Sequence, residues 1–180
     1  MNTRLLTLAL SCFLLGFTLD AAGDDTDIAN LVISGTILPQ TCDVESGSQN
    51  QTVTIGDFAA KDFPSVGSVT TAKDFPINLT GCTAGIEGAK ITFTGTADTT
   101  DPTLLALSDT EGNGTLATGI GVQIIDANQQ PISINNADST VYPLTEGDNQ
   151  LNFALRYKST AATVTSGDAT AVMYFDLSYQ

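Results

Sequence analysis

The chain has 180 residues, enough for one domain with a substantial hydrophobic core. Its formal net charge of −14 at pH 7 disfavours nucleic acids and anionic membranes as partners, because both would be repelled. It contains no histidine, which removes the usual general base and the commonest metal ligand.

Residues 1–23 have the pattern of a secretory signal peptide. Arg4 gives a positive start, a mostly apolar run follows, and small residues up to Gly23 offer a cleavage site. The apolar run is too short for a membrane anchor. The sequence therefore predicts an exported protein whose mature chain begins at Asp24.

The cysteines agree with export. Cys12 lies in the predicted leader, so the mature chain keeps only Cys42 and Cys82. An even pair in an exported chain predicts one disulfide and an oxidising compartment. Closing a loop of this size would stabilise the fold by about 4 kcal/mol in the chain-entropy model.

Residues 24–37 have an acidic start and then alternate. By periodicity alone, this stretch is an ordinary first strand that pairs within its own sheet. A second strand is expected to begin at residues 42–44. The alternating face of the first stretch consists of Ala29, Leu31, Ile33, Gly35 and Ile37.

Short alternating stretches separated by turn residues continue along the chain, and no stretch has a convincing helical period. Pro76 suggests a strand start or a sheet edge. A hairpin is expected where 129–134 pairs back on the strand before it. The predicted strands are 52–56, 75–80, 90–95, 120–126 and 151–157.

The last ten positions, 171–180, have the clearest alternation in the chain and predict a half-buried strand. A terminal strand has no successor to cover its free edge, so another segment is expected to pair with it. The many short strands and the single disulfide predict an all-β, immunoglobulin-like sandwich. The apolar face of the last strand consists of Ala171, Met173, Phe175, Leu177 and Tyr179.

Residues with catalytic potential are few. The mature chain has no histidine and no cysteine outside the expected disulfide, and its carboxylates are scattered through turns, where Asp shapes the backbone. We expect no enzyme activity, no metal site and no cofactor. Two alternatives remain open. One is a secreted carbohydrate-binding sandwich that uses Asp and Asn turns and Tyr142, and the other is a carboxylate-based hydrolase.

Several stretches together resemble the fimbrial subunits (pilins) of the chaperone–usher pathway, type 1 fimbria group. They are the alternating arm that leads through Gly35 to Cys42, and residues 75–82, 119–126 and 153–157. The most specific match is at the end of the chain, where such pilins carry a penultimate tyrosine and a glycine fourteen residues from the end. In this sequence these are Tyr179 and Gly167.

The resemblance implies an immunoglobulin-like fold that lacks its seventh strand and is completed by donor-strand complementation. Residues 24–37 would be the donor-strand extension, residues 38–180 a single pilin domain, and Gly167 would join the alternating residues of 171–179 in the acceptor groove. This implication replaces the ordinary first strand expected from periodicity. A shaft subunit is more consistent with this organisation than a two-domain tip adhesin.

The resemblance also implies partners and a location. The partners would be a periplasmic chaperone, an outer-membrane usher and neighbouring fimbrial subunits in a head-to-tail polymer. The protein would pass through the periplasm to a fimbrium on the bacterial surface, where it would contribute to adhesion.

Overall fold

The computed structural model describes residue 34 and residues 41–110, 112, 114–136 and 140–180. The chain divides into two compact units, Met1–Ile37 and Leu38–Gln180, and the fold described below is that of the second. The predicted leader lies outside the described residues, as does the predicted arm except for Ser34. In the described part of the chain, no helix is long and apolar enough to cross a membrane.

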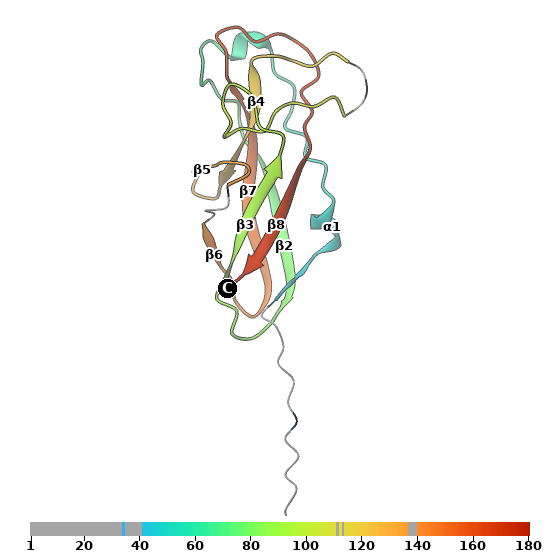
Figure 1. The fold of residues 1–180 in the computed structure, drawn as a ribbon, viewed down its shortest axis with the longest axis vertical. Helices are drawn as coiled ribbons and strands as arrows, with labels where there is room; N and C mark the ends of the chain where they lie inside the picture. The colour runs from blue at the N-terminus through green and yellow to red at the C-terminus, as the bar shows by residue number, and fades with distance from the viewer. Residues whose placement is uncertain (1–33, 35–40, 111, 113, 137–139) are drawn as a thin grey trace, which may run out of the picture. The chain divides into compact units, whose positions relative to one another are not determined.

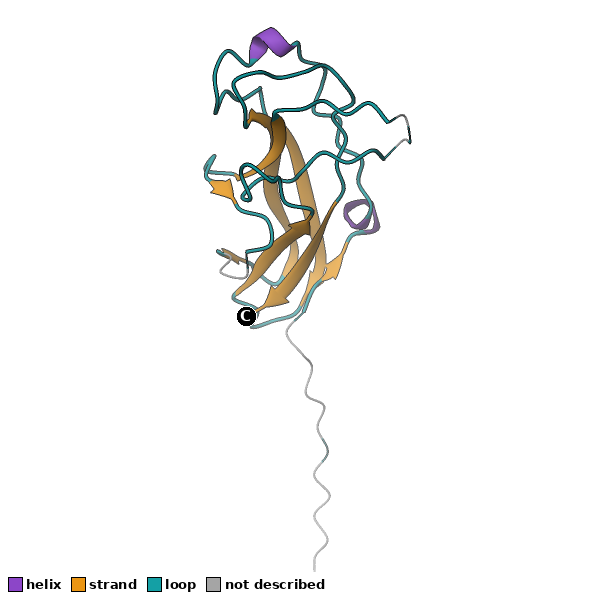
Figure 2. Ribbon diagram, turned by 45° about the horizontal axis from the view of Figure 1, so that its top comes forward, coloured by secondary structure: helices purple, strands orange, loops and turns teal. Residues whose placement is uncertain are grey.

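Two antiparallel sheets form the second unit (Figure 1). The larger sheet has the order β1-β2-β7-β4-β5, with β1 at Asp43–Val44, β2 at Lys73–Cys82, β7 at Gly147–Ser159, β4 at Ile120–Asp126 and β5 at Pro131–Ile132. The smaller sheet has the order β6-β3-β8, with β6 at Val141–Pro143, β3 at Gly88–Gly95 and β8 at Met173–Tyr179. Helix α1 (Ser46–Gln49) and a 3-10 helix (Ala60–Asp62) lie in the connections, as Figure 2 shows.

The two sheets pack face to face through their alternating apolar residues. At the centre, the ring of Phe93 from the smaller sheet meets that of Phe153 from the larger sheet edge to face, with centroids 5.1 Å apart. Phe75 and Tyr142 add further ring contacts to Phe153. This cluster spans both sheets, so the predicted all-β sandwich is confirmed.

One side of the sandwich is joined by backbone bridges. Leu105 bridges to Ala97, just after β3, and to Val122 in β4. Leu105 and Val122 exchange two hydrogen bonds of 2.9 Å. The smaller sheet is therefore linked to the larger one along the β4 edge, and this side is closed.

Most strand predictions are confirmed, because β2, β3, β4, β7 and β8 form where alternation places them, and β5 pairs back on β4. The strand predicted at 52–56 is wrong, since it joins no ladder. Gln51 reaches the Pro76 carbonyl of the adjacent β2 edge only through its side chain, at 2.8 Å. Because proline has no N–H, β2 cannot offer a continuous ladder to this segment.

Candidate functional site

Strand β8 is an edge strand of the smaller sheet. It pairs with β3 on one side, from Ala89 opposite Tyr179 to Gly95 opposite Met173. On its outward face, Tyr174 is 68% exposed. On its inward face, Met173, Phe175, Leu177 and Tyr179 pack against the core and stay only half-buried.

The backbone of β8 alternates in the same way. The N–H of Gln180 donates to the Gly88 carbonyl at 2.8 Å, so that pair is hydrogen-bonded, and every second pair along the ladder shares this geometry. Residues 174, 176 and 178 therefore direct their N–H and C=O groups to β3. The residues between them, from Met173 to Tyr179, direct theirs to the open side. Such an edge can hydrogen-bond another strand.

A second apolar segment accompanies this edge. Its half-buried side chains also pack against the core, and they are Val44, Val53, Ile55 and Phe58. Near the chain end, the Tyr179 hydroxyl donates to the Cys42 carbonyl at 3.0 Å. Near the start of β8, Tyr157 contacts the Phe58 ring at 6.0 Å and donates its hydroxyl to the Ala169 carbonyl at 2.6 Å. The two segments are thus linked at both ends, and we call their half-buried residues the open edge.

Both linking tyrosines are neutral donors at ordinary pH. Burial is the main reason that the pKa of Tyr157 is raised, with Asp57 adding to the effect. Burial also raises the pKa of Tyr179, with the nearby Asp43 adding to the effect. Protonated hydroxyls are required for these bonds to backbone carbonyls, so the links persist well into the alkaline range.

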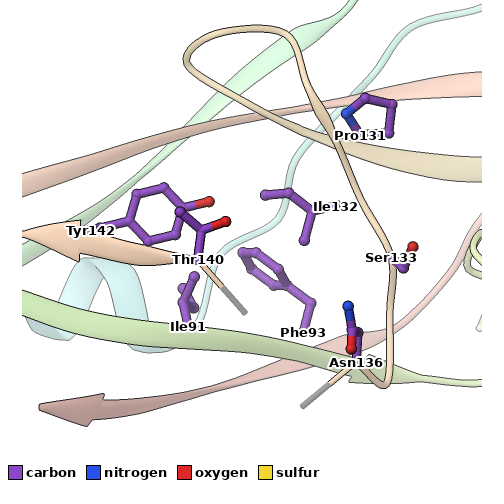
Figure 3. Close-up of a pocket in the computed structure, with 8 residues that line it drawn as sticks. All are labelled: Ile91, Phe93, Pro131, Ile132, Ser133, Asn136, Thr140 and Tyr142. Carbon is purple, nitrogen blue, oxygen red and sulfur yellow. The ribbon is translucent and has the colours of Figure 1, made fainter. Parts of the chain in front are cut away.

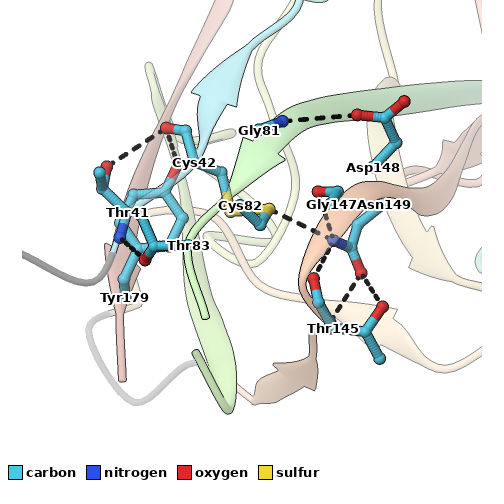
Figure 4. The surroundings of a disulfide bond; sticks show 10 residues. All are labelled: Thr41, Cys42, Gly81, Cys82, Thr83, Thr145, Gly147, Asp148, Asn149 and Tyr179. Carbon is cyan, nitrogen blue, oxygen red and sulfur yellow. Dashed lines mark hydrogen bonds between the residues drawn. A yellow bond between two sulfur atoms is a disulfide. The ribbon is translucent and has the colours of Figure 1, made fainter. Parts of the chain in front are cut away.

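The predicted disulfide between Cys42 and Cys82 is formed, and Figure 4 shows its surroundings. It ties the beginning of the domain to the end of β2. Thr41 and Thr83 strengthen the same junction, because the Thr83 N–H donates to the Thr41 carbonyl at 3.0 Å. The Asn149 side-chain amide lies 3.2 Å from the Cys82 sulfur.

The structure places the remaining predicted site residues as follows. Ala171 precedes β8, which begins at Met173, and packs against the core. Gly167 lies at a bend where a Cβ would collide with the backbone of Leu116 and Ala117. The predicted donor residues lie outside the described residues, and they are Ala29, Leu31, Ile33, Gly35 and Ile37.

Sequence reasoning did not associate Val53, Ile55 and Phe58 with the last strand. The alternation of Val53 and Ile55 was a usable signal, but it predicted a strand at 52–56 within the sheet, and Phe58 lies beyond that strand. The structure instead shows alternation produced by packing against the core without pairing. Tyr157 was likewise assigned only to its strand, and its hydroxyl contact depends on the fold.

A separate pocket of about 120 Å³ lies between β3, β5 and β6 (Figure 3). Its lining combines Ile91, Phe93, Pro131 and Ile132 with Ser133, Asn136, Thr140 and Tyr142. The volume is well below the roughly 300 Å³ at which small-molecule sites usually begin. The lining has no carboxylate, so it gives no support to a carboxylate-based hydrolase. Within the described residues, no group of three or more potential metal-binding side chains occurs.

A family model described as fimbrial protein matches residues 31–180. The chain belongs to the fimbrial protein family. The uncharacterized fimbrial-like protein YcbU of Escherichia coli K12 is 53% identical over 149 residues, which cover 82% of each chain. The fimbrial subunit type 1 of Salmonella typhimurium is 35% identical, with both chains fully covered.

A solved structure agrees with this assignment. The Burkholderia pseudomallei antigen and type I fimbria protein is 38% identical, with a TM-score of 0.59, and the match covers 80% of this chain and 91% of that one. The chain is accordingly a structural subunit of a chaperone–usher fimbria, exported through the periplasm to the cell surface. Its sandwich is the incomplete immunoglobulin-like fold that this family completes by donor-strand complementation.

Proposed function

We propose that residues 24–37 of one copy fill the open edge of a neighbouring copy as a donor strand. The single observation that carries this proposal is β8, which pairs only with β3 among the described strands and has half-buried apolar side chains on its inward face. The proposed donor side chains alternate in the same way as the strand that would receive them. They are Ala29, Leu31, Ile33, Gly35 and Ile37.

The energetics favour a long-lived joint. Burying several aliphatic side chains at about 1.5 to 3 kcal/mol each gives a gross gain on the order of 5 to 10 kcal/mol before ordering costs. Backbone hydrogen bonds to Met173, Phe175, Leu177 and Tyr179 would add directionality to this gain. Gly35 lacks a side chain and would allow close approach to the neighbour's backbone.

The proposed polymer is head-to-tail. Each copy carries one donor segment and one open edge, so the contact is heterologous and does not close on itself. A filament follows from this geometry. Before assembly, a periplasmic chaperone would cover the open edge with its own strand, and an outer-membrane usher would exchange it for the donor segment. We further propose that residues 1–23 are removed on export and that the chain has no catalytic role.

A synthetic peptide of residues 24–37 tests this proposal. Added to the isolated domain of residues 38–180, it should raise the melting temperature measured by circular dichroism, because it binds only the folded state. A matched peptide with Leu31→Asp and Ile33→Asp should have little effect, since buried carboxylates are costly. Equal melting temperatures with and without the natural peptide would contradict the proposal.

A further inference from the structure

The charged residues divide along the strands into two different ends. The end that carries the disulfide has exposed carboxylates near the start of β7 and the end of β2. Asp43 lies opposite Thr80, and the Glu45 N–H donates to the Asn78 carbonyl at 3.0 Å. We call this the acidic end, and it consists of Asp43, Glu45, Glu87, Glu146 and Asp148.

The opposite end carries exposed lysines. Lys73 begins β2 and lies opposite Leu155, whereas the other end of β2, Cys82, lies opposite Gly147. The 3-10 helix with Lys61 is at the end of the domain away from the C-terminus (Figure 2). Lys61 and Lys73 together form what we call the lysine end. Asp62 and Asp74 are close to them in sequence, and Asp57 acts on Tyr157 at the same end, so this end is mixed in charge and carries more carboxylates than lysines.

Neither lysine forms an ion pair within the part of the domain that the structure describes. Of the six lysine and arginine residues, Arg4 is in the predicted leader. Lys158 forms an ion pair with Asp101 at 2.9 Å, but Lys61 and Lys73 form none within the described residues. Nor can Lys73 reach the acidic end, because the ten residues of β2 separate them by roughly 30 Å. Among the described basic residues, only Lys90, opposite Ser178 in β8, lies in the half of the domain that carries the disulfide.

A polar hollow of about 370 Å³ lies within the acidic end, between Glu45, which follows β1, and strands β2 and β7. Its two carboxylates come from Glu45 and Asp148. Asn78 donates to Glu45 at 2.8 Å, and Gln150 donates to Asn78 at 2.8 Å, which fixes the side chains. The hollow therefore offers two negative charges and the carbonyl oxygen of Gln150, a set of acceptors suited to an ammonium group.

We propose that this hollow binds a lysine ammonium from the lysine end of an adjacent copy in the fibre. The inference rests on the proposed donor-strand polymer. The donor segment connects to its own domain through residues 38–40 and Thr41, beside the disulfide, and the 17 residues of 24–40 reach only about 56 Å when extended. The acidic end must then lie close to the neighbour. Contact between two acidic ends would be repulsive, whereas contact with unpaired lysines is attractive.

Charge reversal tests the contact. We expect Lys61→Glu with Lys73→Glu, and separately Glu45→Lys with Asp148→Lys, to slow polymerisation of the mature chain roughly tenfold at about 50 mM NaCl, measured by light scattering. Combining all four changes should restore the rate to within about threefold of the unmodified chain, because attraction is re-established with opposite signs. At about 500 mM NaCl the differences should shrink to less than about twofold.

Two controls show whether a slower rate is caused by the position of the reversed lysines, by the change in net charge, or by loss of donor-strand binding. Lys90→Glu makes the same change of charge as Lys61→Glu or Lys73→Glu alone, which is half that of the double reversal, but it lies in the disulfide half and should leave the rate nearly unchanged. The peptide of residues 24–37 should still raise the melting temperature of each variant, because the donor strand binds elsewhere. If the peptide fails to stabilise the unmodified domain, the donor mechanism itself is refuted. If the lysine reversals slow assembly no more than Lys90→Glu, or if the combined variant is not restored, the ionic contact is wrong. Glu45→Gln with Asp148→Asn provides a milder pair that keeps the shape of the hollow, and it should slow assembly less than the reversal.

Discussion

Single residues hold the ends of the open edge in place. Tyr179 illustrates this, because the hydroxyl of the penultimate residue closes a hydrogen bond to Cys42, which is 137 positions earlier in the chain. Tyr174 belongs to the same strand and points to solvent without such a bond in the described residues. Tyrosine therefore has two roles within β8. Tyr179, on the inward face, forms a structural hydrogen bond, whereas Tyr174, on the outward face, is exposed to solvent.

Removing the hydroxyl of Tyr179 tests its role. Tyr179→Phe should lower the free energy of unfolding by about 1 kcal/mol, because the Cys42 carbonyl loses the shorter of its two side-chain hydrogen bonds, keeping the one from the Thr41 hydroxyl at 3.3 Å, while the ring is kept. Urea denaturation of the peptide-filled domain measures this difference. Tyr174→Phe is the matched control and should change stability by less than about 0.5 kcal/mol. Equal effects of the two substitutions would show that the contact to Cys42 contributes nothing.

At the scale of elements, the segment after β3 covers the outward face of β4. Strand β4 is buried on both faces for this reason. Leu104 lies so close to β4 that a Cβ added at Gly121 would be 3.1 Å from the Cβ of Leu104. Asp101 fastens the segment to β7 through Lys158 and also accepts a hydrogen bond from the Thr103 hydroxyl at 2.6 Å. Thr103 and then Lys158 lower the pKa of Asp101, although burial opposes them.

This fastening predicts a pH dependence. Because the pKa of Asp101 is lowered on folding, its contribution is present above the ordinary value of 3.8 and is lost as the pH falls through the lowered value. Asp101→Asn should cost up to about 1 kcal/mol at about pH 6, and the difference from the unmodified domain should shrink towards about pH 2. Denaturation at several pH values measures this.

The matched substitution Lys90→Gln removes a cation that forms no ion pair in the described residues, and it should leave the pH profile unchanged. A constant difference between Asp101→Asn and the unmodified domain across the whole pH range would contradict a role for the carboxylate charge.

For the whole molecule, the disulfide and the core together hold an incomplete sandwich. One side is closed by the bridges at Leu105, and the other is the open edge. The Cys42–Cys82 bond ties the segment that precedes β1 to the large sheet, close to Tyr179. It therefore fixes the place at which the chain enters the domain.

Loss of the disulfide should be costly. Cys42→Ser with Cys82→Ser should lower the free energy of unfolding by about 4 kcal/mol, since the bond closes a loop with a sequence separation of 40. Urea denaturation with the peptide present measures it. The unmodified domain treated with a reductant should show a similar loss, and a cost below about 1 kcal/mol in both cases would contradict the prediction.

The sequence by itself determined most strands, the pairing of the two cysteines and the alternation of the last strand. The strands could be predicted because alternation along a short stretch shows which side chains face inward. The disulfide could be predicted because only two cysteines follow the predicted leader. The resemblance of the arm and of Gly167 and Tyr179 to fimbrial subunits was also readable from the sequence and is confirmed at the level of the family.

Only the tertiary structure decided which segments became neighbours. Val53 and Ile55 alternate like a strand, yet Pro76 on the adjacent edge prevents a continuous ladder. The acidic hollow and the lysine end likewise arise because antiparallel strands bring Glu45 and Asp148 together and leave Lys73 at the far end of β2. Local periodicity fixes which way a side chain faces, but contacts between segments distant in the chain depend on register and packing across the whole fold.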